Sequence, residues 1–427
     1  MLAVTHTVTR LSNGLAVATA EMPNMASVCL GVWVGTGSRH EPAALNGAAH
    51  FIEHLLFKGT ARRTARRISE EVEGLGGQLN AYTSEDHTCF YARARADHRA
   101  TLLDVIMDMR LNSRFAPADL VKERAVIKEE RMMYRDQPPH LVQELLNETL
   151  WPEHPLGRAI EGTPRSLDRL TRPRLLEFLR ANYGAENTCI VAAGNVRHEE
   201  LVQEVSRHMR RFPAGAVPVS EPAVSRQDRP RVRLHTMAAE QTQLALGLRT
   251  TSRHDEQRFA LRVLNALFGE CMSSRLFQCL REDRGIAYDV HSAASHFADT
   301  GDMVVYAGVD DDKLPQVLKL IAREMHRLTL RPPDLGEVRR ARDYVIGQFD
   351  LALEGTEAHM SWVGEQLMGY GQLGSPGMVR ERFGAVTPGE VRRAAADFFR
   401  PERMSVALVS PLRRLSFDVE QVFGCLA

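Results

Sequence analysis

The chain has 427 residues, a length that corresponds to about two or three domains of ordinary size. Apolar residues make up 44% and charged residues 25%, so each domain has enough apolar material for a core. Lysine plus arginine and aspartate plus glutamate each number 54, which gives a formal net charge of zero. This balance argues against a general nucleic-acid binder and against a protein that binds membrane surfaces.

The N-terminal residues alternate between apolar and polar types and show neither a signal peptide nor a transit peptide. The longest uncharged stretch, residues 22–38, is too short and too rich in Gly, Pro, Asn and Ser to span a bilayer. The six cysteines are scattered, at positions 29, 89, 189, 271, 279 and 425. We therefore expect a cytoplasmic protein whose cysteines are reduced.

The first predicted element is a β-hairpin with its turn at Asn13-Gly14, because this pair lies between two alternating runs. A strand-like run follows at residues 27–39. An apolar helix is expected next, over residues 46–59, with Asn46 as its N-cap and Gly59 as its C-terminal stop.

This helix carries the motif H-F-I-E-H, in which His50 and His54 lie one turn apart on the same face. Two neutral imidazoles at this spacing suit a tetrahedral zinc ion, and Glu53 beside them can take a proton from an attacking water. A helical pair of histidines can also be a surface or packed pair. The helix is otherwise apolar, however, so these polar side chains need partners if they are buried.

A catalytic zinc needs a third protein ligand, and the best candidate lies on a predicted helix over residues 117–136. Glu123 and Glu130 are two turns apart on one face of this helix, beside aliphatic residues. Glu130 is the candidate anionic ligand, and Glu123 is the candidate partner that orients a ligating histidine. A solvated charged face remains the alternative, because arginine and lysine lie nearby.

Residues 213–230 contain four prolines and few large apolar residues, so we expect an exposed linker between domains 1–212 and 231–427. The halves resemble each other in the order of their predicted elements. Two marker pairs, Arg39 with Arg253 and Asn187 with Arg403, are separated by 214 and 216 residues, which favours an internal duplication. We expect two α+β domains, each a mainly antiparallel sheet covered by helices on one face.

The second half lacks the histidine and glutamate motif. Its residues 271–290 predict a helix that carries Arg281, a turn at Gly285 and a strand that starts near Tyr288. An arginine and a tyrosine can bind a peptide carbonyl and a developing oxyanion, although surface and packing roles are the commoner explanation.

Together these residues resemble the pitrilysin and mitochondrial-processing-peptidase family of zinc metallopeptidases. The motif of that family is H-x-x-E-H, with a distal glutamate about 76 residues further on, and the spacing from His54 leads to Glu130. The similarity covers essentially the whole chain, including the duplication. Its best-matched segments are NGAAHFIEHLLFKGT, GGQLNAYTSEDHTCFYAR, MMYRDQPPH and HPLGRAIEGT.

The resemblance implies that His50, His54 and Glu130 bind Zn²⁺, that Glu53 is the general base, and that Glu123 supports a ligand. It further implies that Arg281 and Tyr288 bind substrate and stabilise the tetrahedral intermediate. In single-chain family members of about this length, that pair comes from the second domain of the other subunit. The resemblance therefore implies a homodimeric clamshell with a composite active site.

The resemblance also implies that an extended substrate adds as a strand along the backbone of Asn80, Ala81 and Tyr82. An ordinary internal strand is the alternative at this position. One departure from the family is Glu270-Cys271, where relatives often carry a run of glycines.

The sequence thus predicts a zinc-dependent endopeptidase that hydrolyses unfolded peptides or extended segments in a cavity between the halves of a dimer. Peptides and a second copy of the chain are the expected partners, without nucleic acid or membrane. The main alternative is a non-catalytic or hetero-oligomeric substrate-binding subunit of the same fold. A zinc hydrolase of another class, such as an amidase, is a weaker one.

Overall fold

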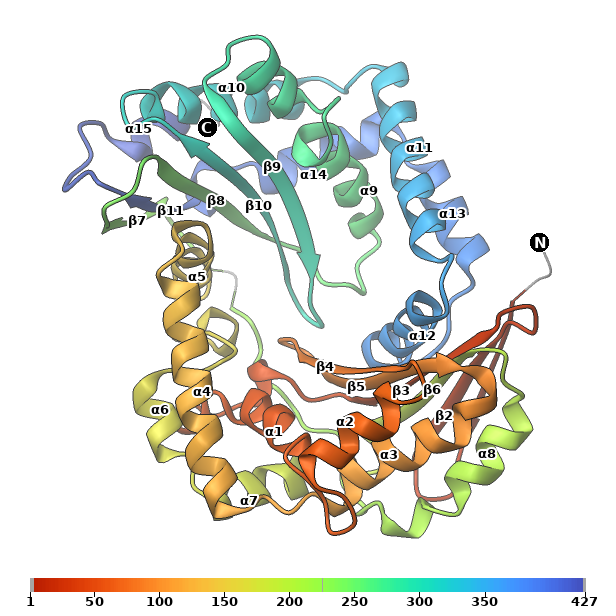
Figure 1. Ribbon diagram of the computed structural model, residues 1–427. Coiled ribbons are helices and arrows are strands. Elements are labelled where there is room, and N and C mark those ends of the chain that lie inside the picture. Colours follow the sequence, from red (N-terminus) through yellow and green to blue (C-terminus); the bar gives the residue numbers. More distant parts are fainter. Residues whose placement is uncertain (1–3, 225, 425–427) are drawn as a thin grey trace. The chain divides into compact units, whose positions relative to one another are not determined.

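The computed structural model of the chain describes residues 4–224 and 226–424, so Cys425 lies outside the described residues (Figure 1). The chain folds into two compact units that each contain one β-sheet. The first unit takes the described parts of residues 1–131, 158–221 and 351–374, and the second takes the described parts of 132–157, 222–350 and 375–427.

The sheet of the first unit is mixed, with β2 and β6 parallel and the other neighbours antiparallel. Its strands lie in the order β1 (Thr5–Arg10), β2 (Ala16–Glu21), β6 (Thr188–Gly194), β3 (Ser27–Val34), β5 (Thr88–Arg95) and β4 (Gln78–Thr83). The expected hairpin is confirmed, because β1 pairs with β2 across a turn in which Gly14 has a φ of +90°.

Helices from along the first half bury their apolar faces against one side of this sheet. They are α1 (Ala48–Leu56), α2 (Ala65–Glu73), α3 (Arg99–Asn112), α4 (Pro117–Arg135), α6 (Pro164–Arg169), α7 (Arg172–Asn182) and α8 (His198–Ser206). On β3, Val28, Leu30 and Val32 face this core, as the alternation of a strand requires.

The second unit repeats this plan, with β7 and β11 parallel and the other neighbours antiparallel. Its strands lie in the order β7 (Arg231–Thr236), β11 (Ser405–Ser410), β8 (Thr242–Thr250), β10 (Gly301–Val309) and β9 (Ala287–His296). Its helices are α9 (Gln257–Asn265), α10 (Leu314–Leu330), α11 (Leu335–Ala352), α13 (Pro376–Ala385), α14 (Pro388–Phe398) and α15 (Val419–Phe423).

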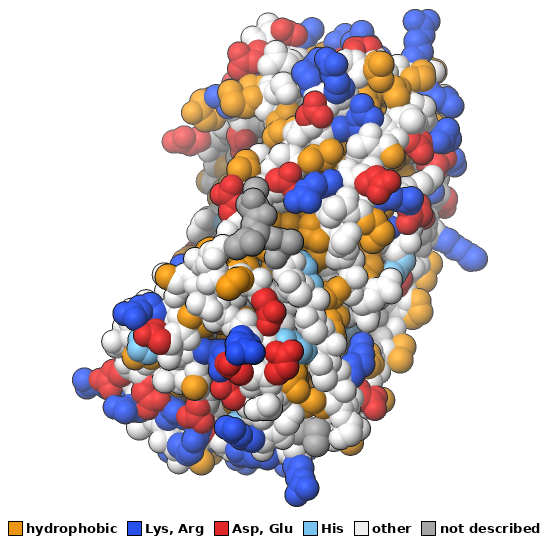
Figure 2. All heavy atoms as spheres, turned by 90° about the vertical axis from the view of Figure 1, so that its right-hand side faces the viewer, with side chains coloured by type: hydrophobic (Ala, Val, Ile, Leu, Met, Phe, Trp, Pro, Cys, Tyr) orange, Lys and Arg blue, Asp and Glu red, His pale blue; other side chains and the backbone are white. Residues whose placement is uncertain are grey.

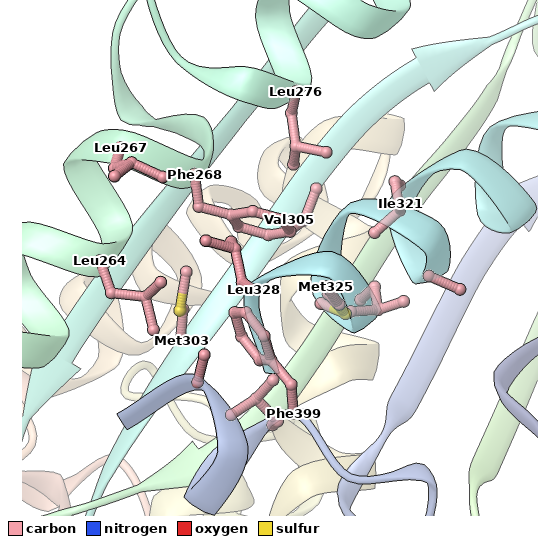
Figure 3. Packing of buried hydrophobic residues seen from close by; sticks show 14 of the residues in the cluster. Leu264, Leu267, Phe268, Leu276, Met303, Val305, Ile321, Met325, Leu328 and Phe399 are labelled. Atoms are coloured by element: carbon pink, nitrogen blue, oxygen red, sulfur yellow. The ribbon is translucent and has the colours of Figure 1, made fainter. Parts of the chain in front are cut away.

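The core of the second unit lies between one face of its sheet and these helices. Figure 3 shows Phe268 and Phe399 close together among Met303, Val305 and Leu328. The centroids of the two rings are 5.2 Å apart. The expectation of two α+β domains with helix-covered sheets is confirmed.

Each sheet also carries one helix on its opposite face, and that helix comes from the other half of the sequence. Helix α12 (Thr356–Tyr370) packs on the sheet of the first unit, where Gly364 lies directly against the Trp33 ring and leaves no space for a Cβ. Helix α5 (Pro138–Leu150) packs its leucines on the sheet of the second unit, against Ala245 and Val304. The compact units therefore differ from the contiguous sequence halves by this exchange of helices.

Residues 213–230, in their described part, form neither helix nor strand. Among the described helices, none is both long enough and apolar enough to cross a membrane. On the face drawn in Figure 2, acidic and basic side chains are interspersed, in keeping with the zero net charge of the chain.

Candidate metal centre

The start of helix α1 is fixed by a buried glutamate. Glu41 accepts hydrogen bonds from the backbone N–H groups of Gly47 and Ala49, both at 2.7 Å, and a third from the Asn46 amide at 3.3 Å. The expectation that Asn46 is the N-cap was wrong, because Gly47 occupies that position with a φ of +95°. Burial raises the pKa of Glu41 to about 7, and its hydrogen bonds to the helix oppose that rise.

Helices α1 and α4 bring three metal-ligating side chains to one point. One donor atom each from His50, His54 and Glu130 lies within 4.8 Å of the other two. The Glu130 Oε2 atom is 3.6 Å from His54 Nε2 and 4.0 Å from His50 Nε2. The two imidazole rings have centroids 4.6 Å apart. These are the residues that the sequence pattern predicts as ligands.

The second nitrogen of His54 faces Glu123. His54 Nδ1 and Glu123 Oε2 are 3.2 Å apart, and the Lys58 ammonium lies 2.9 Å from the other Glu123 oxygen. Glu123 is buried, and its carboxylate lies between the His54 ring and the Lys58 ammonium. These two groups compensate the cost of burying its charge. With a proton on Nδ1, the Nε2 atom of His54 keeps its lone pair for a metal.

Helix α4 is tied to the rest of the first unit by its own polar side chains. Arg124 donates to the carbonyl oxygens of Leu167 and Leu170, and its guanidinium lies over the Phe51 ring of α1. Lys128 pairs with Asp168 at 2.6 Å. The alternative of a solvated charged face therefore does not apply to Glu123, because this residue is buried.

The local electrostatics suit a divalent cation. Burial and, to a smaller extent, the neighbouring His54 together lower the pKa of His50 to about 3, so His50 is neutral at physiological pH. Among the described residues, Glu130 Oε2 and His50 Nδ1 are buried polar atoms without a hydrogen-bond partner. An unsatisfied carboxylate oxygen that faces two imidazole nitrogens fits a metal ligand set of two histidines and one glutamate.

Glu53 lies on the same helix and is in contact with strand β4. The Thr83 hydroxyl donates a hydrogen bond of 2.6 Å to Glu53 Oε2. Burial raises the pKa of Glu53, whereas the Thr83 hydrogen bond and the neighbouring His54 lower it. A carboxylate with a raised pKa beside a metal-ligating group is suited to accept and return a proton.

The predicted substrate strand forms one border of the sheet. Strand β4 is the last strand in the order and pairs with β5 on one side. The Ala81 backbone N–H donates to its neighbour Asn80 Oδ1 at 2.8 Å, and the Tyr82 ring packs edge-on against Trp33.

The predicted Arg281 and Tyr288 pair belongs to the second unit. Arg281 lies on a π-helical segment, Phe277–Glu282, and donates to the backbone oxygen of Tyr288 at 2.9 Å. Its guanidinium is 4.9 Å from the centre of the Tyr288 ring. The Tyr288 residue is 76% exposed. The two side chains are therefore neighbours. Glu270, at the departure from the family pattern, pairs with Arg262.

The sequence did not predict two residues of the site, Glu41 and Thr83. Glu41 precedes the helix by seven residues, and Thr83 is separated from Glu53 by thirty residues. An acidic residue shortly before the helix expected over residues 46–59 was the signal available in the sequence for Glu41. The sequence contains no signal for the Thr83 contact, because it depends on how β4 packs against α1.

Comparison with known proteins identifies the family. Residues 16–164 match the insulinase family (peptidase family M16), and residues 169–345 match the M16 inactive domain. An uncharacterized zinc protease of Streptomyces coelicolor is 37% identical over 95% of this chain and 89% of its own length. The chain belongs to peptidase family M16. The resemblance expected from the sequence is therefore confirmed.

Other M16 relatives agree with this assignment. The beta subunit of the mitochondrial-processing peptidase of Blastocladiella emersonii is 32% identical, over 96% of this chain and 89% of its own length. A Helicobacter pylori protease of known structure superposes with a TM-score of 0.90 at 21% identity and covers 96% of this M16 chain and 100% of its own. An M16 inactive domain from Pseudomonas fluorescens gives 0.89 at 18% identity, over 97% of this chain and 100% of its own. At such identities the structures establish a shared fold.

Replacing Glu123 by Gln should lower the affinity of this M16 chain for a divalent metal by about 10- to 100-fold, because His54 loses a charged partner. Competition with a chromophoric chelator measures this affinity. Glu129→Gln, at an exposed position of the same helix, is the matched control and should bind as the unmodified chain does. Equal affinities for all three proteins would contradict the role of Glu123.

Proposed function

We propose that the chain is a zinc-dependent endopeptidase that acts on peptides or extended, unfolded segments. The convergence of His50, His54 and Glu130, with the Glu53 carboxylate on the same helix, carries this proposal. Two histidines and one carboxylate are a common protein ligand set for a catalytic zinc, with one further position open. Relatives named as zinc proteases support the choice of zinc and of peptide hydrolysis.

When bound, a zinc ion supplies a Lewis acid that polarises the scissile carbonyl and lowers the pKa of the attacking water. Glu53 accepts a proton from this water and then passes the proton to the leaving amine nitrogen. Glu123 holds the proton on His54 Nδ1 and thereby keeps the ring oriented. His50 stays neutral because of its burial.

The substrate in this proposal binds as an added strand on β4. An edge strand offers backbone N–H and C=O groups to an extended peptide, whatever the side chains of that peptide are. Asn80, Ala81 and Tyr82 supply these groups. The peptide would replace the local hydrogen bond between the Ala81 N–H and Asn80.

The proposal includes a homodimer in which Arg281 and Tyr288 of one subunit complete the active site of the other. The zinc ligands belong to the first compact unit, and the Arg281 and Tyr288 pair belongs to the second. An exposed tyrosine beside an arginine can bind a peptide carbonyl and stabilise the negative charge that develops on its oxygen. The proposal also includes the cytoplasmic location expected from the sequence.

A non-catalytic or hetero-oligomeric substrate-binding subunit remains the alternative function. In such a role the zinc ligands and the base are dispensable. The presence of His50, Glu53, His54 and Glu130 in one cluster favours the catalytic function instead. The paired Arg281 and Tyr288 likewise favour a peptidase over an amidase.

Replacing Glu53 by Gln should leave one zinc per chain and reduce kcat for peptide hydrolysis by at least about 100-fold, because the base is lost. Zinc content by mass spectrometry and turnover of a mixed peptide pool measure the two effects. Glu73→Gln, at an exposed position of α2, should behave as the unmodified chain does. Full activity of Glu53→Gln, or of chelator-treated protein, would refute the proposed mechanism.

Mixing two inactive variants, Glu53→Gln and Tyr288→Phe, should restore part of the activity after subunit exchange. In a mixed dimer, one of the two composite sites has an intact base and an intact tyrosine. Native mass spectrometry follows the exchange, and peptide turnover follows the recovery. Proven exchange without recovery would mean that Tyr288 does not act across the dimer.

A further inference from the structure

We propose that Thr83, the last residue of β4, is a positioning residue for Glu53 and that one strand thereby fixes both the substrate and the base. This inference rests on the proposed peptidase function and adds a residue to it. The contact that carries it is the hydrogen bond of 2.6 Å from the Thr83 hydroxyl to Glu53 Oε2.

The geometry of this contact leaves one carboxylate oxygen for chemistry. A short O–H···O bond to a carboxylate is stronger than a bond between neutral groups, so it holds Oε2 in one orientation. In the described part of the chain, Thr83 is the only side chain that donates a hydrogen bond to Glu53. The lone pairs of Oε1 therefore stay free for the proton of the attacking water.

The hydroxyl itself is held by a rigid turn. Directly after Thr83, the Ser84 N–H donates to the carbonyl oxygen of His87 at 2.8 Å. The segment that follows β3 binds the same turn. The backbone N–H groups of Ser38 and Arg39 donate hydrogen bonds of 3.0 Å to the carbonyl oxygens of Ser84 and Glu85. A hydroxyl on such a backbone loses little entropy when it orients a neighbour.

Strand alternation explains how β4 serves two purposes. Leu79 and Ala81 pack into the core on the side of helix α1, and Thr83 lies on the same face. The backbone N–H and C=O groups of the proposed substrate site lie in the plane of the sheet, along the outer edge of this strand. Strand β4 thus positions both a peptide on this edge and the Glu53 carboxylate on α1. It thereby fixes the position of the scissile bond relative to the base.

The test compares Thr83→Val, which removes the hydroxyl and keeps the shape, with Thr83→Ser, which keeps the hydroxyl. We expect Thr83→Val to lower kcat about 10- to 100-fold with KM changed less than about 2-fold, because misplacement of a catalytic group by about 1 Å has an effect of this size. Thr83→Ser should recover most of the activity. Thr7→Val, on the edge strand β1 of the same sheet, should match the unmodified chain.

A double-mutant cycle separates positioning from an independent structural effect. If Thr83 acts through the carboxylate, Thr83→Val should lower kcat no further in a Glu53→Asp background. Multiplicative losses, or equal losses for Val and Ser, would overturn the inference. Zinc content and melting temperature should be the same in all these variants.

Crystal structures give a readout that does not depend on activity. The Glu53 carboxylate should keep its orientation in Thr83→Ser and be rotated or disordered in Thr83→Val. An unchanged carboxylate in Thr83→Val would refute the positioning role even if the chain proved to be a peptidase. A displaced carboxylate in a chain without peptidase activity would instead support the positioning role and refute the proposed function.

Discussion

The structure depends on one constraint. The side chains of His50, His54 and Glu130 must meet at a partly buried point and keep their ligand atoms available for a metal ion. Isolated polar groups in such a place destabilise a fold unless they find partners. Within the described residues, Glu130 Oε2 is buried without a hydrogen-bond partner although it faces Nε2 of both His50 and His54, an arrangement that fits a metal ligand. The surrounding elements hold this unsatisfied arrangement together.

Three separate segments of the first unit contact helix α1. Glu41 binds the N-terminus of α1, Glu123 on α4 contacts its C-terminal histidine, and Thr83 on β4 contacts its carboxylate. Each contact joins α1 to a different element of the first unit. The helix therefore has little freedom to rotate or slide, and the predicted ligands and base keep their relative positions.

The sequence predicted the local features and missed those that depend on tertiary packing. The spacing of His50 and His54 on one helix, and of Glu130 on a second, followed from helical periodicity and from the family resemblance. The cap by Glu41 was missed because Asn46 is the better N-cap by residue type, although its amide here donates to Glu41 instead. The exchange of α5 and α12 was also missed. An amphipathic helix carries no information about which of two similar sheets it covers.

The central claim is that one zinc ion binds to His50, His54 and Glu130. Zinc K-edge X-ray absorption on the unmodified chain and on Glu130→Gln tests this claim most directly. The account predicts one zinc per chain with two imidazole nitrogens, and a carboxylate contribution that disappears in Glu130→Gln. A zinc environment that contains sulfur, or one that is identical in the two proteins, would contradict the account.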